Sequence, residues 1–230
     1  MSTGVRLRTD RQTFEEWARV MPGVVLPKEL GFSTAPLGGY AGDRVLPPVV
    51  AASLALHSCA DVAITLNRWV PDQRVFSCFA IAGDLAASLV RGGDNVEIGL
   101  FGLSSVVPEV IRLVPAEPPR VADADGVAGV LDDTGGLHVD AAGVSANTAG
   151  VPGDASGVRV DTAGVEITVV AADAAAAGWQ QTLVGGAPRW RRVRRRSAPA
   201  PAWLEPVLDV RQELAADLRF ALADCIAIDE

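Results

Sequence analysis

Histidine and cysteine, which often catalyse reactions or hold metals, are few and scattered in this chain of 230 residues. The two histidines are His57, in an apolar stretch, and His138, inside a repeat. A tetrahedral zinc site needs three or four His or Cys ligands, and no His or Cys pair has metal-ligand spacing. The G-x-S-x-G motif that presents a nucleophilic serine is absent as well. We therefore expect no enzyme activity and no bound metal.

Two glycine-rich segments could in principle cradle a phosphate group. They are LGGYAGD (37–43) and RGGDN (91–95). Neither carries the lysine of a P-loop, and neither has the glycine spacing of a dinucleotide-binding turn. Both are better explained as turns, and we expect no cofactor.

Arginines are concentrated in the segment RWRRVRRR (189–196). Such a segment could bind a nucleic-acid backbone while its tryptophan stacks on a base. The residues of this alternative are Arg189, Trp190, Arg191, Arg192, Arg194, Arg195 and Arg196. The simpler interpretation is an exposed strand or turn, and we favour it because a net charge of −8 disfavours contact with phosphates.

Cysteine usage and hydropathy indicate the compartment. Cys59, Cys78 and Cys225 lie in apolar runs without close spacing, which predicts reduced core thiols and no disulfide framework. The first 20 residues lack the apolar core of a signal peptide. The longest apolar run, residues 45–56, is too short to cross a bilayer. These features predict a cytoplasmic protein without a membrane span.

The elements that must position any site begin with helices. The spacing of apolar residues predicts a helix over 13–21, with Thr13 and Glu16 as its capping box. Further helices are expected at 47–60 and 104–114 and near the end of the chain. The last of these is indicated by apolar residues at helical spacing: Val207, Val210, Leu214, Leu218, Leu222 and Cys225.

Alternating apolar residues predict strands between these helices. Four strands, at 61–70, 74–82, 85–91 and 96–102, are joined by short turns and form an antiparallel meander. Residues 165–173 and part of 179–197 are expected to add strands. The predicted fold class is α+β, with a central antiparallel sheet (meander 61–102), flanking helices and a C-terminal helix.

A heptapeptide repeat occupies residues 126–167, in which a glycine recurs every seven residues and is always followed by Val or Leu. Ordering seven residues costs roughly 7–14 kcal/mol of backbone entropy. Burying one Val or Leu returns only about 1.5–3 kcal/mol. We therefore predict one domain over 1–230, with 126–164 as a flexible insert; a short β-roll is the alternative.

Residues 59–119 resemble the EspG family of actinobacterial proteins, which serve type VII (ESX) secretion. The likeness lies in the order of an alternating strand led by "DV", an "RWVP" turn, a strand ending in "AIAGD", the strands "SLVR" and "DNVEIGL", and a helix closing on "LVPAEPP". Residues 14–32 resemble the opening helix of that family and its proline-led exit.

This resemblance implies a cytosolic chaperone that binds the hydrophobic tip of PE–PPE-type secretion substrates. Alternation along the strands predicts that one side of the meander faces the core, with Val62, Ile64, Leu66, Phe79, Ile98 and Leu100. It predicts that Trp69, Phe76 and Phe101 face away and bind the partner. The alternative is that the C-terminal helix covers that side.

Overall fold

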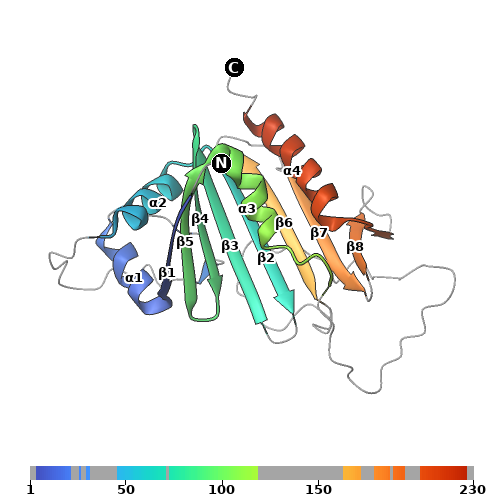
Figure 1. Cartoon of the computed structure of the whole chain (residues 1–230), viewed down its shortest axis with the longest axis horizontal. Coiled ribbons are helices and arrows are strands. Elements are labelled where there is room, and N and C mark those ends of the chain that lie inside the picture. The colour runs from blue at the N-terminus through green and yellow to red at the C-terminus, as the bar shows by residue number, and fades with distance from the viewer. Residues whose placement is uncertain are drawn as a thin grey trace.

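A computed structural model gives the fold and describes residues 4–21, 26, 30–31, 46–70, 73–118, 163–171, 179–186, 189–194 and 203–226. In these residues, nine strands form one antiparallel sheet with helices against both faces (Figure 1). The strand order is β1-β5-β4-β3-β2-β6-β7-β8-β9. The predicted α+β class, with its central antiparallel meander and its C-terminal helix, is confirmed.

The strands are β1 (Val5–Asp10), β2 (Val62–Val70), β3 (Gln73–Ala82), β4 (Leu85–Gly92), β5 (Asn95–Gly102), β6 (Gly164–Ala171), β7 (Trp179–Gly186), β8 (Arg189–Arg194) and β9 (Trp203–Pro206). The helices are α1 (Arg11–Val20), α2 (Pro48–Ser58), α3 (Val106–Arg112) and α4 (Val210–Ile226), with a 3-10 turn η2 (Leu103–Ser105) before α3.

One arrangement occurs twice along the chain: four strands of a meander followed by a helix. The first copy comprises β2 to β5 and α3, and the second comprises β6 to β9 and α4. The copies meet at the antiparallel pair of β2 and β6, where Val62 lies opposite Ala171 and Trp69 opposite Gly164. As a result, α3 and α4 lie on the same face of the sheet and contact each other.

The face beneath α3 and α4 holds the largest group of buried apolar side chains. Val62, Ile64 and Leu66 of β2 point to this side, because alternate residues of a strand project from the same face. Their neighbours in this group include Phe79, Phe101, Ile167, Leu183, Trp190, Val110, Leu214 and Leu218. Burial of these side chains between the sheet and the two helices is the main apolar contribution to the stability of the fold.

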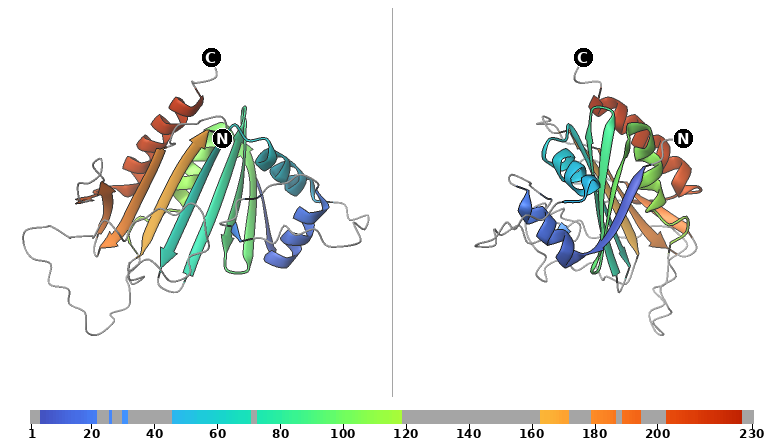
Figure 2. Two further views of the ribbon diagram at one scale, coloured as in Figure 1. Left: turned by 180° about the vertical axis from the view of Figure 1, so that it is seen from behind. Right: turned by 60° about the vertical axis from the view of Figure 1, so that its left-hand side comes forward.

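The opposite face is covered by α1 and α2 over β1, β5, β4 and β3, as the edge-on view in Figure 2 shows. Here Phe14 of α1 and Leu54 of α2 pack with Cys78, Leu89 and Ile98. The prediction that Ile98 and Leu100 share a face with Val62 is therefore wrong. Both faces of this half of the sheet are buried, so alternation alone could not assign the inner one.

Helix α1 begins two residues before the predicted start, and its cap differs. The carboxylate of Asp10 accepts hydrogen bonds from Thr13 N (2.8 Å) and Thr13 Oγ1 (2.7 Å). These bonds lower the pKa of Asp10. Thr13 thus lies inside the first turn, and the predicted capping box is wrong.

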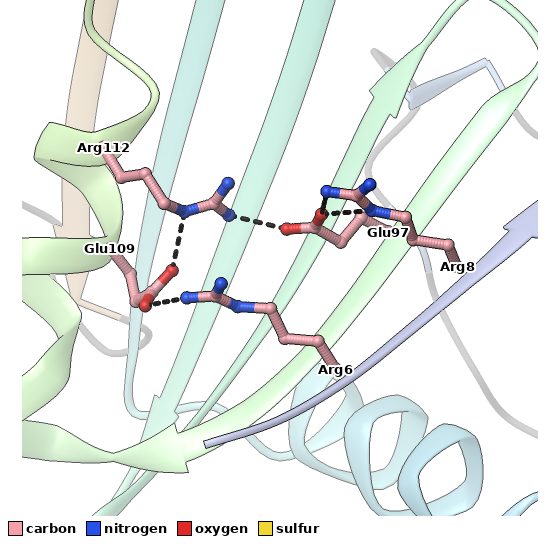
Figure 3. Close-up of polar contacts among 5 residues, drawn as sticks. All are labelled: Arg6, Arg8, Glu97, Glu109 and Arg112. Carbon is pink, nitrogen blue, oxygen red and sulfur yellow. Dashed lines mark hydrogen bonds and ion pairs between the residues drawn. The ribbon is translucent and has the colours of Figure 1, made fainter. Parts of the chain in front are cut away.

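Five charged side chains join β1 to α3 on the face that also carries Phe101 (Figure 3). Arg6 forms an ion pair with Glu109. Glu97 forms ion pairs with Arg8 (N–O distance 2.9 Å) and with Arg112 (2.6 Å). Burial raises the pKa of Glu97, but its hydrogen bonds and its attraction to the two arginines outweigh that effect and lower it. Since both carboxylates are already paired, this cluster clamps the edge strand to α3.

The heptapeptide repeat falls almost wholly outside the described residues. Of the predicted insert 126–164, the structure describes Ala163 and Gly164, both buried, and Gly164 begins β6. The last copy of the repeat, residues 161–167, therefore runs into a central strand of the sheet.

Candidate partner-binding face

The helices leave one side of β2, β6, β7 and β8 uncovered in the described part of the chain. This side, opposite α3 and α4, is called here the open face. From behind, Figure 2 shows β6 and β7 in front of α4, with α1 and α2 displaced toward β1 and β5. By contrast, both sides of β4 carry buried side chains, such as Ala86 on one side and Leu89 on the other.

The open face has a mixed chemical character, with apolar side chains among hydroxyls and amides. Val170 is 40% exposed, and Val184 and Thr182 of β7 are half-buried. The carboxylate of Glu166 accepts a hydrogen bond from Gln180 Nε2 at 2.6 Å. Such a surface of small apolar and polar groups suits a protein partner better than a small molecule, which needs a concave pocket.

Trp69 is the largest side chain of the open face, and its placement depends on a glycine. Trp69 and Gly164 lie directly opposite each other on β2 and β6. A Cβ atom on Gly164 would lie 2.0 Å from Cζ2 of the indole, so the ring rests on the Cα of Gly164. The side chain is half-buried, and its contact with the Gly164 backbone restricts the ring to this position. A rigid aromatic residue of this kind is typical of the energetic centre of a protein interface.

We predict a strong coupling between these two residues in stability. Gly164→Ala is expected to lower the free energy of unfolding by about 1–3 kcal/mol, because the added methyl group must displace the indole. In the Trp69→Ala background the same change should be neutral or stabilise by up to about 1 kcal/mol, because a strand glycine is replaced without a clash. Urea unfolding of the four proteins of this double-mutant cycle measures the difference. Equal effects of Gly164→Ala in both backgrounds would contradict the packing.

The other two aromatic residues predicted for partner binding lie elsewhere. Phe101 is 5% exposed and packs edge-to-face on Phe79, with ring centroids 6.4 Å apart, in the group beneath α3. The prediction that it faces away from the core is wrong. Phe76 shares the side of β3 that carries Cys78 and packs partly against the residues beneath α1 and α2. It borders the open face, opposite Asn67 of β2.

The arginine-rich segment is divided between the two faces by strand alternation. Trp190 and Arg192 point toward α4 and are buried, whereas Arg189 and Arg191 project to the open face. Trp190 Nε1 donates a hydrogen bond to the carbonyl oxygen of Pro115 at 3.1 Å. The side chain of Arg194 and all of Arg195 and Arg196 lie outside the described residues.

The position of Arg192 further weakens the nucleic-acid alternative. Its guanidinium pairs with Asp217 (2.9 Å) and Glu213 (3.5 Å) of α4. Stacking of Trp190 on a base, as that alternative requires, is contradicted by the 2% exposure of its side chain.

Among the described residues, no group of three or more His, Cys, Asp or Glu could hold a metal ion. Nδ1 of His57 lies 3.9 Å from Sγ of Cys78, but this thiol is 2% exposed and burial lowers the pKa of His57 to about 4. The pair therefore belongs to the packing between α2 and β3. Cys59, predicted to lie in the core, is instead exposed.

Among the helices in the described ranges, none is both long enough and apolar enough to span a lipid bilayer.

Comparisons with known proteins agree with this architecture. No protein-family model matches the chain, and no curated protein matches its sequence. In structure the chain is similar to EspG5 of Mycobacterium tuberculosis, the type VII secretion system chaperone, solved in complex with the PE25–PPE41 dimer. The two superpose with a TM-score of 0.53 and 14% identity over 96% of each chain. The fold of this chain is thus EspG-like.

Proposed function

We propose that this chain is a chaperone that caps the apolar tip of a PE–PPE-type substrate of type VII secretion, and that it acts by binding and not by catalysis. The observation that carries the proposal is the open face, with the indole of Trp69 held against Gly164 where β2 ends and β6 begins. The EspG-like fold supports it, because the similar protein EspG5 was solved as a chaperone bound to a PE25–PPE41 dimer.

The mechanism follows from the hydrophobic effect. An apolar tip exposed in water would associate with copies of itself, whereas contact with the open face removes it from solvent. Each Å² of apolar area buried contributes about 25 cal/mol before the entropic costs of association. The rigid placement of Trp69 keeps those costs low on the side of the chaperone.

The test is co-expression of the chain with PE–PPE pairs from its own genome, followed by size-exclusion chromatography in 0.5 M NaCl. We expect a stable complex, because apolar contacts resist salt. Trp69→Asp is expected to weaken it at least about 30-fold, as the loss of an aromatic hot-spot residue does.

Phe220→Asp provides the matched control, because Phe220 is an aromatic residue on α4, on the other side of the sheet, and is 70% exposed. This variant should bind as the unchanged protein does. A complex that survives Trp69→Asp but is lost with Phe220→Asp would assign the contact to α4 and refute the open face.

A further inference from the structure

The open face is basic although the chain as a whole is acidic. Among the described residues on this side of β2, β3 and β6 to β8, the charged side chains beyond the reach of α1 and α2 are Arg74, Arg189, Arg191 and Glu166. The net charge of the whole chain is −8. The described charged residues on the side where the partner is proposed to bind are therefore mostly positive.

Two of these arginines flank Trp69 in a single row across the sheet. Arg74 of β3 lies directly opposite Trp69, and the row continues through Gly164 and Val184 to Arg191 of β8. Four strand spacings separate the backbones of the two arginines, which is about 19 Å. The row thus has an apolar centre with a cation near each end.

The arginines of this row differ from the arginines of the fold that form ion pairs within the chain. Arg6, Arg8, Arg112 and Arg192 are each paired with a carboxylate of the chain itself. Within the described ranges, neither Arg74 nor Arg191 has an ion-pair partner, and Arg74 is exposed. Their charges are available to a partner. Glu166, the one acid among the described residues of this face, is already hydrogen-bonded to Gln180.

We propose that Arg74 and Arg191 select the partner, and that the segment they select presents an apolar centre with a carboxylate on each side. This inference rests on the proposed function, since it concerns the same face. Apolar contact with Trp69 and Val184 supplies most of the affinity. The arginines accelerate association and disfavour tips that carry cations at the same positions, because like charges at an interface are repulsive.

The probe for this experiment is a display library of helical hairpins with a randomised tip, selected on the immobilised full chain. We expect the selected tips to combine Leu, Phe or Trp with a five-fold or greater excess of Asp and Glu over Lys and Arg. Arg74→Glu together with Arg191→Glu should reverse that excess in favour of Lys and Arg. Arg219→Glu, which changes an exposed arginine of α4, should leave the excess as it is.

Each outcome decides between the two proposals. The selection could return apolar tips without an acidic excess, and these tips could be lost when the selection is repeated on Trp69→Asp. That result would overturn the role of the arginines but support the capping function. An acidic excess that persists in the double variant would also overturn the role of the arginines. Failure to enrich any tip above the starting library would count against both proposals.

Discussion

Replacing Trp190 by alanine is expected to lower the free energy of unfolding by about 3–5 kcal/mol, the range for truncation of a buried aromatic side chain. The indole is 2% exposed and packs in the group beneath α3 and α4. The substitution also leaves the carbonyl oxygen of Pro115 without its donor. For a chain of this size the midpoint of thermal unfolding should fall by about 10 °C.

This result bears directly on the arginine-rich segment. Trp190→Phe serves as the matched variant, because it keeps most of the apolar volume and removes the hydrogen bond. Its free energy of unfolding should be lower than that of the unchanged protein by about 1–2 kcal/mol. Calorimetry measures both losses. A Trp190→Ala protein with an unchanged transition but weaker binding to single-stranded DNA would contradict the buried position and restore the nucleic-acid alternative.

Strand patterns in the first half of the chain were sufficient to predict the meander, because its turns carry clear local signals. Gly83 and Gly93 adopt positive φ angles of 53° and 59° at two-residue turns, the conformation that glycine favours. Strands β1 and β9 are short and lie at the two edges of the sheet, so neither has a long alternating pattern. The sequence pattern therefore does not predict them.

The candidate site was only partly predictable. Trp69 was correctly expected to point away from Val62, since the two residues are an odd number of positions apart on one strand. Phe101 was misassigned because both faces of β5 are buried, and alternation does not say which of two buried faces is inner. The row from Arg74 to Arg191 could not be foreseen, because it depends on how β2 pairs with β6, some 100 residues away. The glycine opposite Trp69 is likewise a consequence of that register.

The burial of His57 should cost the chain stability in mild acid. Nε2 of His57 is buried and has no hydrogen-bond partner among the described groups. Burial lowers the pKa of this ring from 6.5 to about 4. Below pH 6.5 the unfolded chain therefore binds a proton that the folded chain does not bind, until the folded form is protonated near pH 4. The free energy of unfolding should fall across this window by about 3 kcal/mol from this residue.

His57→Leu isolates this contribution, because a leucine in the last turn of α2 cannot titrate. Urea unfolding of both proteins at pH 7.5, 6, 5 and 4 gives the difference in stability at each pH. The carboxylates, including Asp10 and Glu97 with their lowered pKa values, are common to both and cancel. We expect the free energy of unfolding of the variant, relative to that of the unchanged protein, to rise by about 3 kcal/mol between pH 7.5 and pH 4. Most of this rise should occur below pH 6. If the difference in stability between the two proteins stays constant with pH, the ring is protonated as easily in the folded chain as in water. The ring would then not be buried between α2 and β3.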